Sequence, residues 1–226
     1  MKVSDDRSAT NATTANAALP KAGGTMTGNL ATAGISAVTA GTSNFVAGVN
    51  AGNSIESGGN YNTVVGDEAG TAITTGDYNV GLGYRALLAN TTGTQNTSIG
   101  TDTLRANDTG TNNTGVGQAA LFANTTASNN TGIGHSALRN NTTGAFNAAL
   151  GAEALLTNTA GASNTAVGYQ SLKLATTASN NTSMGYRALR TTTTGANNVA
   201  IGSSALYANT TGTENVSVGA NSMLAN

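Results

Sequence analysis

The chain has 226 residues, thirty glycines, one proline and a formal net charge of −1, with only 8% charged residues. This composition lies outside that of ordinary globular domains and leaves a repeat protein, a disordered tract or a fibre. The near-zero charge disfavours nucleic acid and anionic membrane as partners, since both bind dense Lys and Arg surfaces, and the absence of cysteine excludes disulfides and thiolate metal sites.

Residues 1–43 form the first segment and do not follow the period that organises the rest of the chain. The first twenty residues lack the apolar core of a secretory signal, and no apolar run in the chain reaches eighteen residues, so we expect no membrane insertion. The segment holds the only proline, in the phrase "ALPKAGGTMTGNLATAGI" of residues 18–35. We interpret residues 1–43 as an N-terminal attachment or linker segment.

The second segment, residues 44–226, restates one phrase every seventeen residues. We take one glycine of the phrase as the origin of each repeat. An internal repeat of fixed period is the strongest signal of the architecture. The ten origin glycines are Gly66, Gly83, Gly100, Gly117, Gly134, Gly151, Gly168, Gly185, Gly202 and Gly219. A degenerate copy of the repeat lies around Gly48 and is offset by one extra residue. The segment is therefore an array of about ten full repeats.

Other positions of the repeat keep one residue type. An aliphatic residue or Met precedes every origin glycine, and Leu follows it by four residues in eight copies, with Gly70 and Met223 in the other two. Four residues before the glycine stands an asparagine in every copy, namely Asn62, Asn79, Asn96, Asn113, Asn130, Asn147, Asn164, Asn181, Asn198 and Asn215. A merely soluble tract has no reason to keep such columns, so disorder is disfavoured. Several Gly, Thr and Asn in each repeat disfavour helices.

The repeat predicts an all-β fold, a β-solenoid in which each coil has two or three short strands joined by tight turns. In "NTSIG", residues 96–100, alternation predicts that Thr97 and Ile99 share the buried side of a strand. Leu104 is expected to add a second core contact after a bend, and the "NTTG" phrase to form a corner. Coils stacked about 4.8 Å apart would make ten coils a rod of about 50 Å.

Stacking of identical coils is expected to align identical side chains. We predict that the asparagines from Asn62 to Asn215 form a ladder of side-chain hydrogen bonds, as asparagines do in cross-β assemblies. A second, incomplete ladder is predicted at a corner, made of Asn90, Asn107, Asn124, Asn141, Asn158 and Asn209. The charged residues two and five positions after the glycine, such as Arg85 and Arg105, are expected to face solvent.

Two phrases resemble bacteriophage proteins. Residues 19–30, "LPKAGGTMTGNL", resemble a short element of tailed-bacteriophage tail fibres, and "NTAVGYQSL" (164–172) and "NTSMGYRAL" (181–189) resemble stalk repeats of the same family. The repeats are similar, more loosely, to the β-rolls of trimeric bacterial adhesin heads. The resemblance implies a homotrimeric fibre on the virion tail, with other tail or tip proteins as partners at the chain ends. A bacterial cell-surface fibre is the alternative location.

No candidate catalytic or cofactor site emerges. Three segments such as "GLGYRA" (81–86) satisfy a dinucleotide-binding pattern, but they recur with the period and no helix is predicted after them, so we interpret their glycines as turn residues. The single histidine, His135, has no clustered Cys or carboxylate around it and is expected to be a surface residue. We therefore predict no enzyme activity, no metal and no cofactor.

The remaining candidates are binding residues. Tyr84, Tyr169 and Tyr186 share the position after the origin glycine and are hypothesised to stack on sugar rings of a host surface glycan. The sequence thus predicts a structural and adhesive fibre segment, a rod that presents or carries host-receptor binding. The alternatives are a bacterial extracellular adhesin-type solenoid and an ice- or crystal-binding solenoid, the latter because the "NTT" columns could form a flat Thr array.

Overall fold

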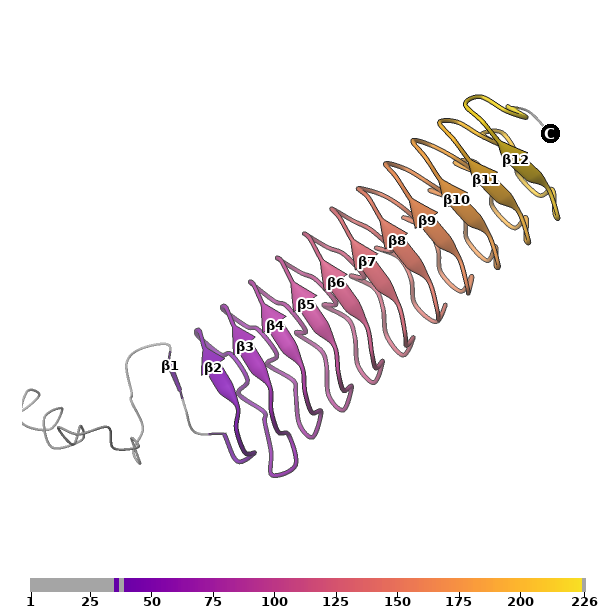
Figure 1. Cartoon of the computed structure of the whole chain (residues 1–226). Coiled ribbons are helices and arrows are strands. Elements are labelled where there is room, and N and C mark those ends of the chain that lie inside the picture. The colour runs from indigo at the N-terminus through magenta and orange to yellow at the C-terminus, as the bar shows by residue number, and fades with distance from the viewer. Residues whose placement is uncertain (1–34, 37–38, 225–226) are drawn as a thin grey trace, which may run out of the picture.

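The computed structural model describes residues 35–36 and 39–224, and they form one elongated β-solenoid (Figure 1). Its single sheet has twelve strands that follow one another in chain order. The strands are β1 (Ile35–Ser36), β2 (Phe45–Ala47), β3 (Thr63–Val65), β4 (Val80–Leu82), β5 (Thr97–Ile99), β6 (Thr114–Val116), β7 (Thr131–Ile133), β8 (Ala148–Leu150), β9 (Thr165–Val167), β10 (Thr182–Met184), β11 (Val199–Ile201) and β12 (Val216–Val218). The predicted all-β solenoid of 17-residue coils is confirmed. The tail-fibre phrase of residues 19–30 lies outside the described residues.

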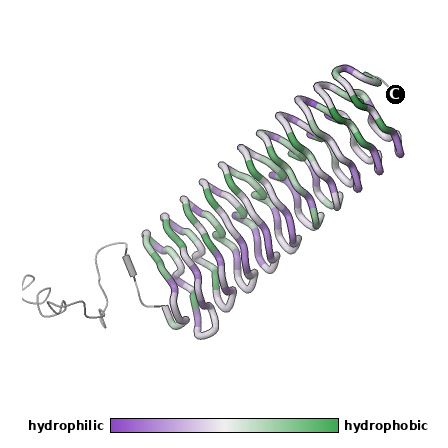
Figure 2. The backbone as a smooth tube through the Cα atoms, viewed as in Figure 1, coloured by the Kyte–Doolittle hydropathy of each residue, from purple (hydrophilic) through white to green (hydrophobic). Residues whose placement is uncertain are grey.

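Strands β2 to β12 are parallel, and each pairs with the strand one coil away. The register advances by seventeen residues, as from Val80 to Thr97, except between β2 and β3, where Phe45 pairs with Thr63. That step of eighteen matches the extra residue expected near Gly48. Strand β1 pairs antiparallel with β2. Figure 2 shows hydrophobic segments recurring at corresponding places of successive coils along the rod.

Each coil has one three-residue strand rather than the two or three that the sequence predicted. The other residues of a coil form turns whose backbone groups bond to the neighbouring coils, for example Asp102 N to Tyr84 O at 2.9 Å. Left-handed residues tighten these turns, since Gln95, Asp102 and Leu104 have φ values of 59°, 56° and 49°. The same three positions are left-handed in successive coils, which lets seventeen residues close one circuit with a single strand.

The predicted buried side of the strand is wrong. The central residue of every strand from β2 to β12 is buried, whereas the residues on either side of it are half-buried or exposed. Ile99, predicted to be core, is 39% exposed, and Ser98 beside it is fully buried. The reason is space: the thin interior holds one large side chain per coil, and fully buried Leu104 occupies it. Only a small residue then fits at the centre of the strand.

The first two coils fill the same interior with a different set of side chains. Gly70 stands where later coils have Leu, and Val64 and Ile73 supply the bulk from the strand centre and the opposite corner. A Cβ atom on Gly70 would lie 2.7 Å from Val64 Cγ1 and 2.8 Å from Ile73 Cδ1. The large side chain has therefore moved within the coil, which conserves packed volume. This exchange explains why the Leu column lacks its first member.

Candidate functional site

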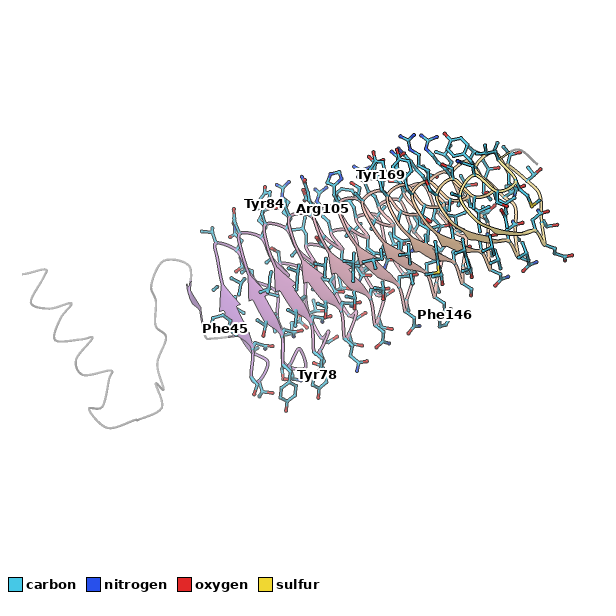
Figure 3. All side chains as sticks on the ribbon, turned by 45° about the horizontal axis from the view of Figure 1, so that its top comes forward. Phe45, Tyr78, Tyr84, Arg105, Phe146 and Tyr169 are labelled. Carbon is cyan, nitrogen blue, oxygen red and sulfur yellow. The ribbon has the colours of Figure 1, made fainter. Side chains whose placement is uncertain are left out.

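The exposed aromatic side chains lie along separate parts of the rod. Tyr84, Arg105 and Tyr169 project from one edge, Tyr78 and Phe146 from the opposite edge, and Phe45 belongs to β2 of the sheet (Figure 3). The first edge carries residues one and five positions after the origin glycine, and the opposite edge carries the residue five positions before it. Any ligand of the rod would meet these edges or the outer face of the sheet.

The predicted asparagine ladder runs inside the rod, beside the sheet. Asn79 donates from its backbone N and from Nδ2 to Asn62 Oδ1, at 2.9 and 3.1 Å, and its Nδ2 also donates to Gly93 O at 2.9 Å. The backbone bond recurs at every step from Asn62 to Asn215. The direct side-chain bond is missing at Asn130 and Asn147, where no Nδ2-to-Oδ1 bond joins the rungs. These residues hold the fold and are not available to a ligand.

The second ladder lies at the adjacent corner. Nδ2 of Asn107 donates to Asn90 Oδ1 at 2.7 Å, and the pattern continues through Asn124 and Asn141 to Asn158. It stops there because Ala175 and Thr192 occupy the next two coils. The Oδ1 atom of Asn158 is consequently buried without a hydrogen-bond partner. Asn209 resumes the column further along the rod.

Of the three tyrosines predicted to bind a glycan, the structure brings two together. Tyr169 and Tyr186 stack with ring centroids 5.7 Å apart and are 43% and 47% exposed. Tyr84 lies five coils away on the same edge, roughly 24 Å along the rod, and packs under the guanidinium of Arg85. Tyr84 is therefore too far from the stacked pair for one sugar to cover all three rings.

A polar network surrounds the Tyr169–Tyr186 pair. Glu153 accepts from Lys173 Nζ at 2.7 Å and from Gln170 Nε2 at 2.8 Å, and Gln170 Oε1 accepts from Nε of Arg187 and of Arg190, each at 3.1 Å. The hydrogen bonds from Lys173, first, and from Gln170 lower the pKa of the Glu153 carboxyl below its usual range. These polar and charged side chains bind one another, and the network stiffens this edge of the rod.

A pair of tyrosines that sequence reasoning did not single out lies on the opposite edge. Tyr61 and Tyr78 are 52% and 56% exposed, and their rings stack with centroids 4.9 Å apart and planes 6° from parallel. Beside Tyr78 lies a shallow hollow of about 270 Å³, lined by Asp77, Tyr78, Thr94 and Gln95. The signal in the sequence was the spacing of the two tyrosines, seventeen residues, which places them on adjacent coils.

The outer face of the sheet carries a row of aliphatic side chains. Because the predicted buried side was wrong, the residue before each origin glycine points outward, and Ile133, Leu150 and Ile201 are 36%, 49% and 40% exposed. The parallel register aligns these side chains in one column. A continuous apolar column on an outer face is typical of an interaction surface.

The described residues contain no group of three or more His, Asp or Glu side chains that could hold a metal ion. His135 is exposed, and the glycines of "GLGYRA" lie in β4 and the turn after it. Over the part of the chain that the structure describes, no helix has the length and apolar character to cross a membrane. Comparisons with protein-family models, curated proteins and solved structures return no match.

Proposed function

We propose that this chain is a structural and adhesive segment of a bacteriophage tail fibre, a rigid rod on the virion tail that presents or carries host-receptor binding. The observation that carries the proposal is the unbroken stack of eleven parallel strands, β2 to β12. Each coil contacts only its neighbours, so adding coils adds length without changing the cross-section. A repeat of this kind makes a spacer whose length is set by the number of coils.

Stiffness comes from hydrogen bonds that run along the rod axis. Every coil bonds to the next through the strands and turns of the backbone and through the Asn62–Asn215 ladder. Bending the rod would stretch these bonds on one side, and buried polar groups that lose their partners cost about 1–3 kcal/mol each. The rod can therefore hold a receptor-binding part at a fixed distance.

The resemblance of residues 19–30 to a tail-fibre element supports a phage fibre over the alternative, a bacterial extracellular adhesin built from the same repeat. Both proposals assign the rod the same mechanical role and differ in the particle that carries it. Electron microscopy of the native particle, with gold-labelled antibody against the chain, tests the choice. Label along phage tail fibres supports the proposal, and label on bacterial cell surfaces in uninfected cultures supports the alternative.

The fibre is proposed to be a homotrimer, and the outward aliphatic column supports this part. The column runs through ten strands at about 4.8 Å spacing and forms a continuous apolar stripe along the outer face of the sheet. A second and a third copy of the chain would cover such a stripe along its whole length, because each copy carries the same repeat. Light scattering during size exclusion should give about three times the chain mass of 22.1 kDa. A monomer mass contradicts the trimer.

Ice or crystal binding is a second candidate, favoured by one observation. Thr is the first residue of six of the parallel strands, namely Thr63, Thr97, Thr114, Thr131, Thr165 and Thr182, and the sheet aligns these residues on its outer face. The neighbouring aliphatic column mixes Val, Ile, Leu and Met, which makes the face uneven, so we favour self-association. A thermal-hysteresis assay decides: freezing-point depression beyond the colligative value supports ice binding, and its absence removes this candidate.

A further inference from the structure

The hollow beside Tyr78 combines an aromatic wall with polar groups. Its walls are Asp77 and Tyr78 from one coil and Thr94 and Gln95 from the next, and its volume is about 270 Å³. Tyr61, in the preceding coil, covers one face of the Tyr78 ring at a centroid distance of 4.9 Å. The hollow borders Tyr78 on the side of the next coil, where Thr94 and Gln95 lie and no described aromatic ring stacks on Tyr78.

The polar groups on this side of the ring have unused hydrogen-bonding capacity. Oδ1 of Asp77 accepts from the backbone N of Asn60 at 2.6 Å, which leaves Oδ2 for another donor. The Thr94 hydroxyl and the Gln95 carboxamide have no side-chain hydrogen bond to residues 39–224. Together these three side chains offer both donors and acceptors at the rim of an apolar ring.

The fold does not require tyrosine at this corner. Tyr61 and Tyr78 have φ values of 57°, in the left-handed region that asparagine tolerates and bulky residues avoid. Asparagine holds the same position in four other coils, as Asn112, Asn129, Asn180 and Asn197. With more than half of each tyrosine exposed, packing offsets little of that conformational cost. The turn itself therefore does not call for tyrosine, and the exposed pair is a candidate for a binding role.

We propose that this corner binds a neutral pyranose, one sugar ring of a glycan, with the sugar packed against the side of Tyr78 that borders the hollow. The C–H groups on one face of a pyranose carry partial positive charge and pack against the negative face of an aromatic ring. Asp77, Thr94 and Gln95 then bind the sugar hydroxyls. No cationic side chain lines the hollow and Asp77 is acidic, so sugars with carboxylate or phosphate groups are disfavoured.

The size of the hollow sets the length of ligand that it holds. Its volume falls below the roughly 300 Å³ at which sites for drug-sized ligands begin, and it is open to solvent. One ring fits, and further sugars of the glycan would extend into water. The site goes beyond the proposed fibre function and needs neither a trimer nor a virion, so its test and that of the fibre can fail separately.

The experiment measures binding of single sugars to the full chain by saturation-transfer difference NMR. The probes are methyl α-D-glucopyranoside, methyl β-D-galactopyranoside and N-acetylglucosamine, with N-acetylneuraminic acid as the anionic comparison. We expect saturation transfer to the ring protons of at least one neutral sugar at millimolar concentration, and none to the anionic sugar. Transfer only to N-acetylneuraminic acid, or to no sugar, overturns the proposal.

Two variants locate the site. Tyr78→Asn installs the residue that the left-handed position prefers, so the coil is expected to fold, and binding should weaken by about three- to tenfold, as expected for loss of a stacking ring. Phe146→Asn removes an exposed ring from the same left-handed position four coils away and should change binding less than about twofold. Gln95→Ala should weaken binding without changing the circular dichroism spectrum. Equal losses in Tyr78→Asn and Phe146→Asn, or full binding by Tyr78→Asn, contradict the assignment.

Discussion

A Cβ atom on Gly83 would lie 2.7 Å from the carbonyl oxygen of Gly100, the corresponding glycine one coil further along the rod. The φ of Gly83 is +135°, a backbone conformation that residues other than glycine rarely adopt. The same approach recurs between successive origin glycines from Gly66 to Gly202. At this spacing of the coils no Cβ atom fits at the origin position. The glycine is therefore the same in every coil of the array.

Gly83→Ala is expected to destabilise the rod by more than about 3 kcal/mol, because it adds backbone strain to a clash with a carbonyl that cannot move away. Gly81→Ala, two residues earlier, is the control, since its Cβ would lie 3.3 Å or more from its neighbours. Urea unfolding followed by circular dichroism should show a large loss for the first variant and little change for the second. Equal stability of the two would contradict the close-approach argument.

Asn113→Asp tests the inner ladder. Nδ2 of Asn113 donates to Asn96 Oδ1 at 3.2 Å and to Ala127 O at 2.8 Å, so a carboxylate there would face two acceptors in a fully buried place. A buried charge without a partner should cost at least about 3 kcal/mol of unfolding free energy. Asn112→Asp changes the exposed neighbour and should cost little. The comparison uses thermal melts at pH 7, and similar melting temperatures would show that the ladder contributes nothing.

The seventeen-residue period, the solenoid and the alignment of the asparagines could be predicted from the sequence, because stacking repeats one environment in every coil. The side of the strand that is buried could not be predicted from alternation. A three-residue strand fits alternation in either phase, and the choice is made by Leu104, which fills an interior too thin for Ile99 as well. The small residue at Ser98 was the available signal, since only a small side chain fits opposite a buried Leu.

The candidate site, too, could be predicted from the sequence only in part. Tyr169 and Tyr186 could be paired from their spacing, and so could Tyr61 and Tyr78, yet the hollow beside Tyr78 depends on which turn residues project at that corner. Tyr84 shares the column of Tyr169 but lies too far along the rod to act with it. Position in a repeat predicts the edge on which a residue lies, whereas a binding site also needs neighbours in adjacent coils.

The double variant Ala175→Asn/Thr192→Asn should stabilise the rod by completing the second ladder. Oδ1 of Asn158 is buried without a partner, and in the preceding coils Nδ2 of the next asparagine donates to this atom at 2.7–3.0 Å. Satisfying a buried acceptor contributes about 1–3 kcal/mol, so the melting temperature should rise by a few degrees. Ala175→Ser is too short to reach Asn158 and should give no rise. A lower melting temperature for the double variant would mean that the interior cannot hold the larger side chains.

The Glu153–Lys173 pair predicts a small dependence of stability on pH. The pKa of Glu153 is lowered in the folded chain, so its stabilising effect is present above the unfolded value of about 4.3 and is lost as the pH falls through the folded pKa. Glu153→Gln should therefore reduce stability at pH 7, by less than about 1 kcal/mol because the pair is partly exposed, and should match the wild type under strongly acidic conditions.

The matched control for this pair is Glu214→Gln, which removes an exposed carboxylate that forms no ion pair with the described residues. At pH 7 it should lower the melting temperature less than Glu153→Gln does. High salt should also shrink the effect of Glu153→Gln, since it screens a partly exposed pair. An effect of Glu153→Gln that grows as the pH falls has the wrong sign for a lowered pKa and would contradict the ion-pair argument.

Leu150→Asp tests whether the outer face of the sheet joins copies of the chain. Leu150 is 49% exposed on β8, so a carboxylate there remains hydrated in a single chain and should leave the coil folded. In a trimer that buries this face, the same change would place three carboxylates in an apolar interface, where unpaired charges cost several kcal/mol. Light scattering should therefore show a shift from trimer to monomer with an unchanged circular dichroism spectrum. Gln118→Asp adds the same charge on the edge that carries Tyr84 and should keep the trimer mass, so a trimer that survives Leu150→Asp would exclude the sheet face as the interface.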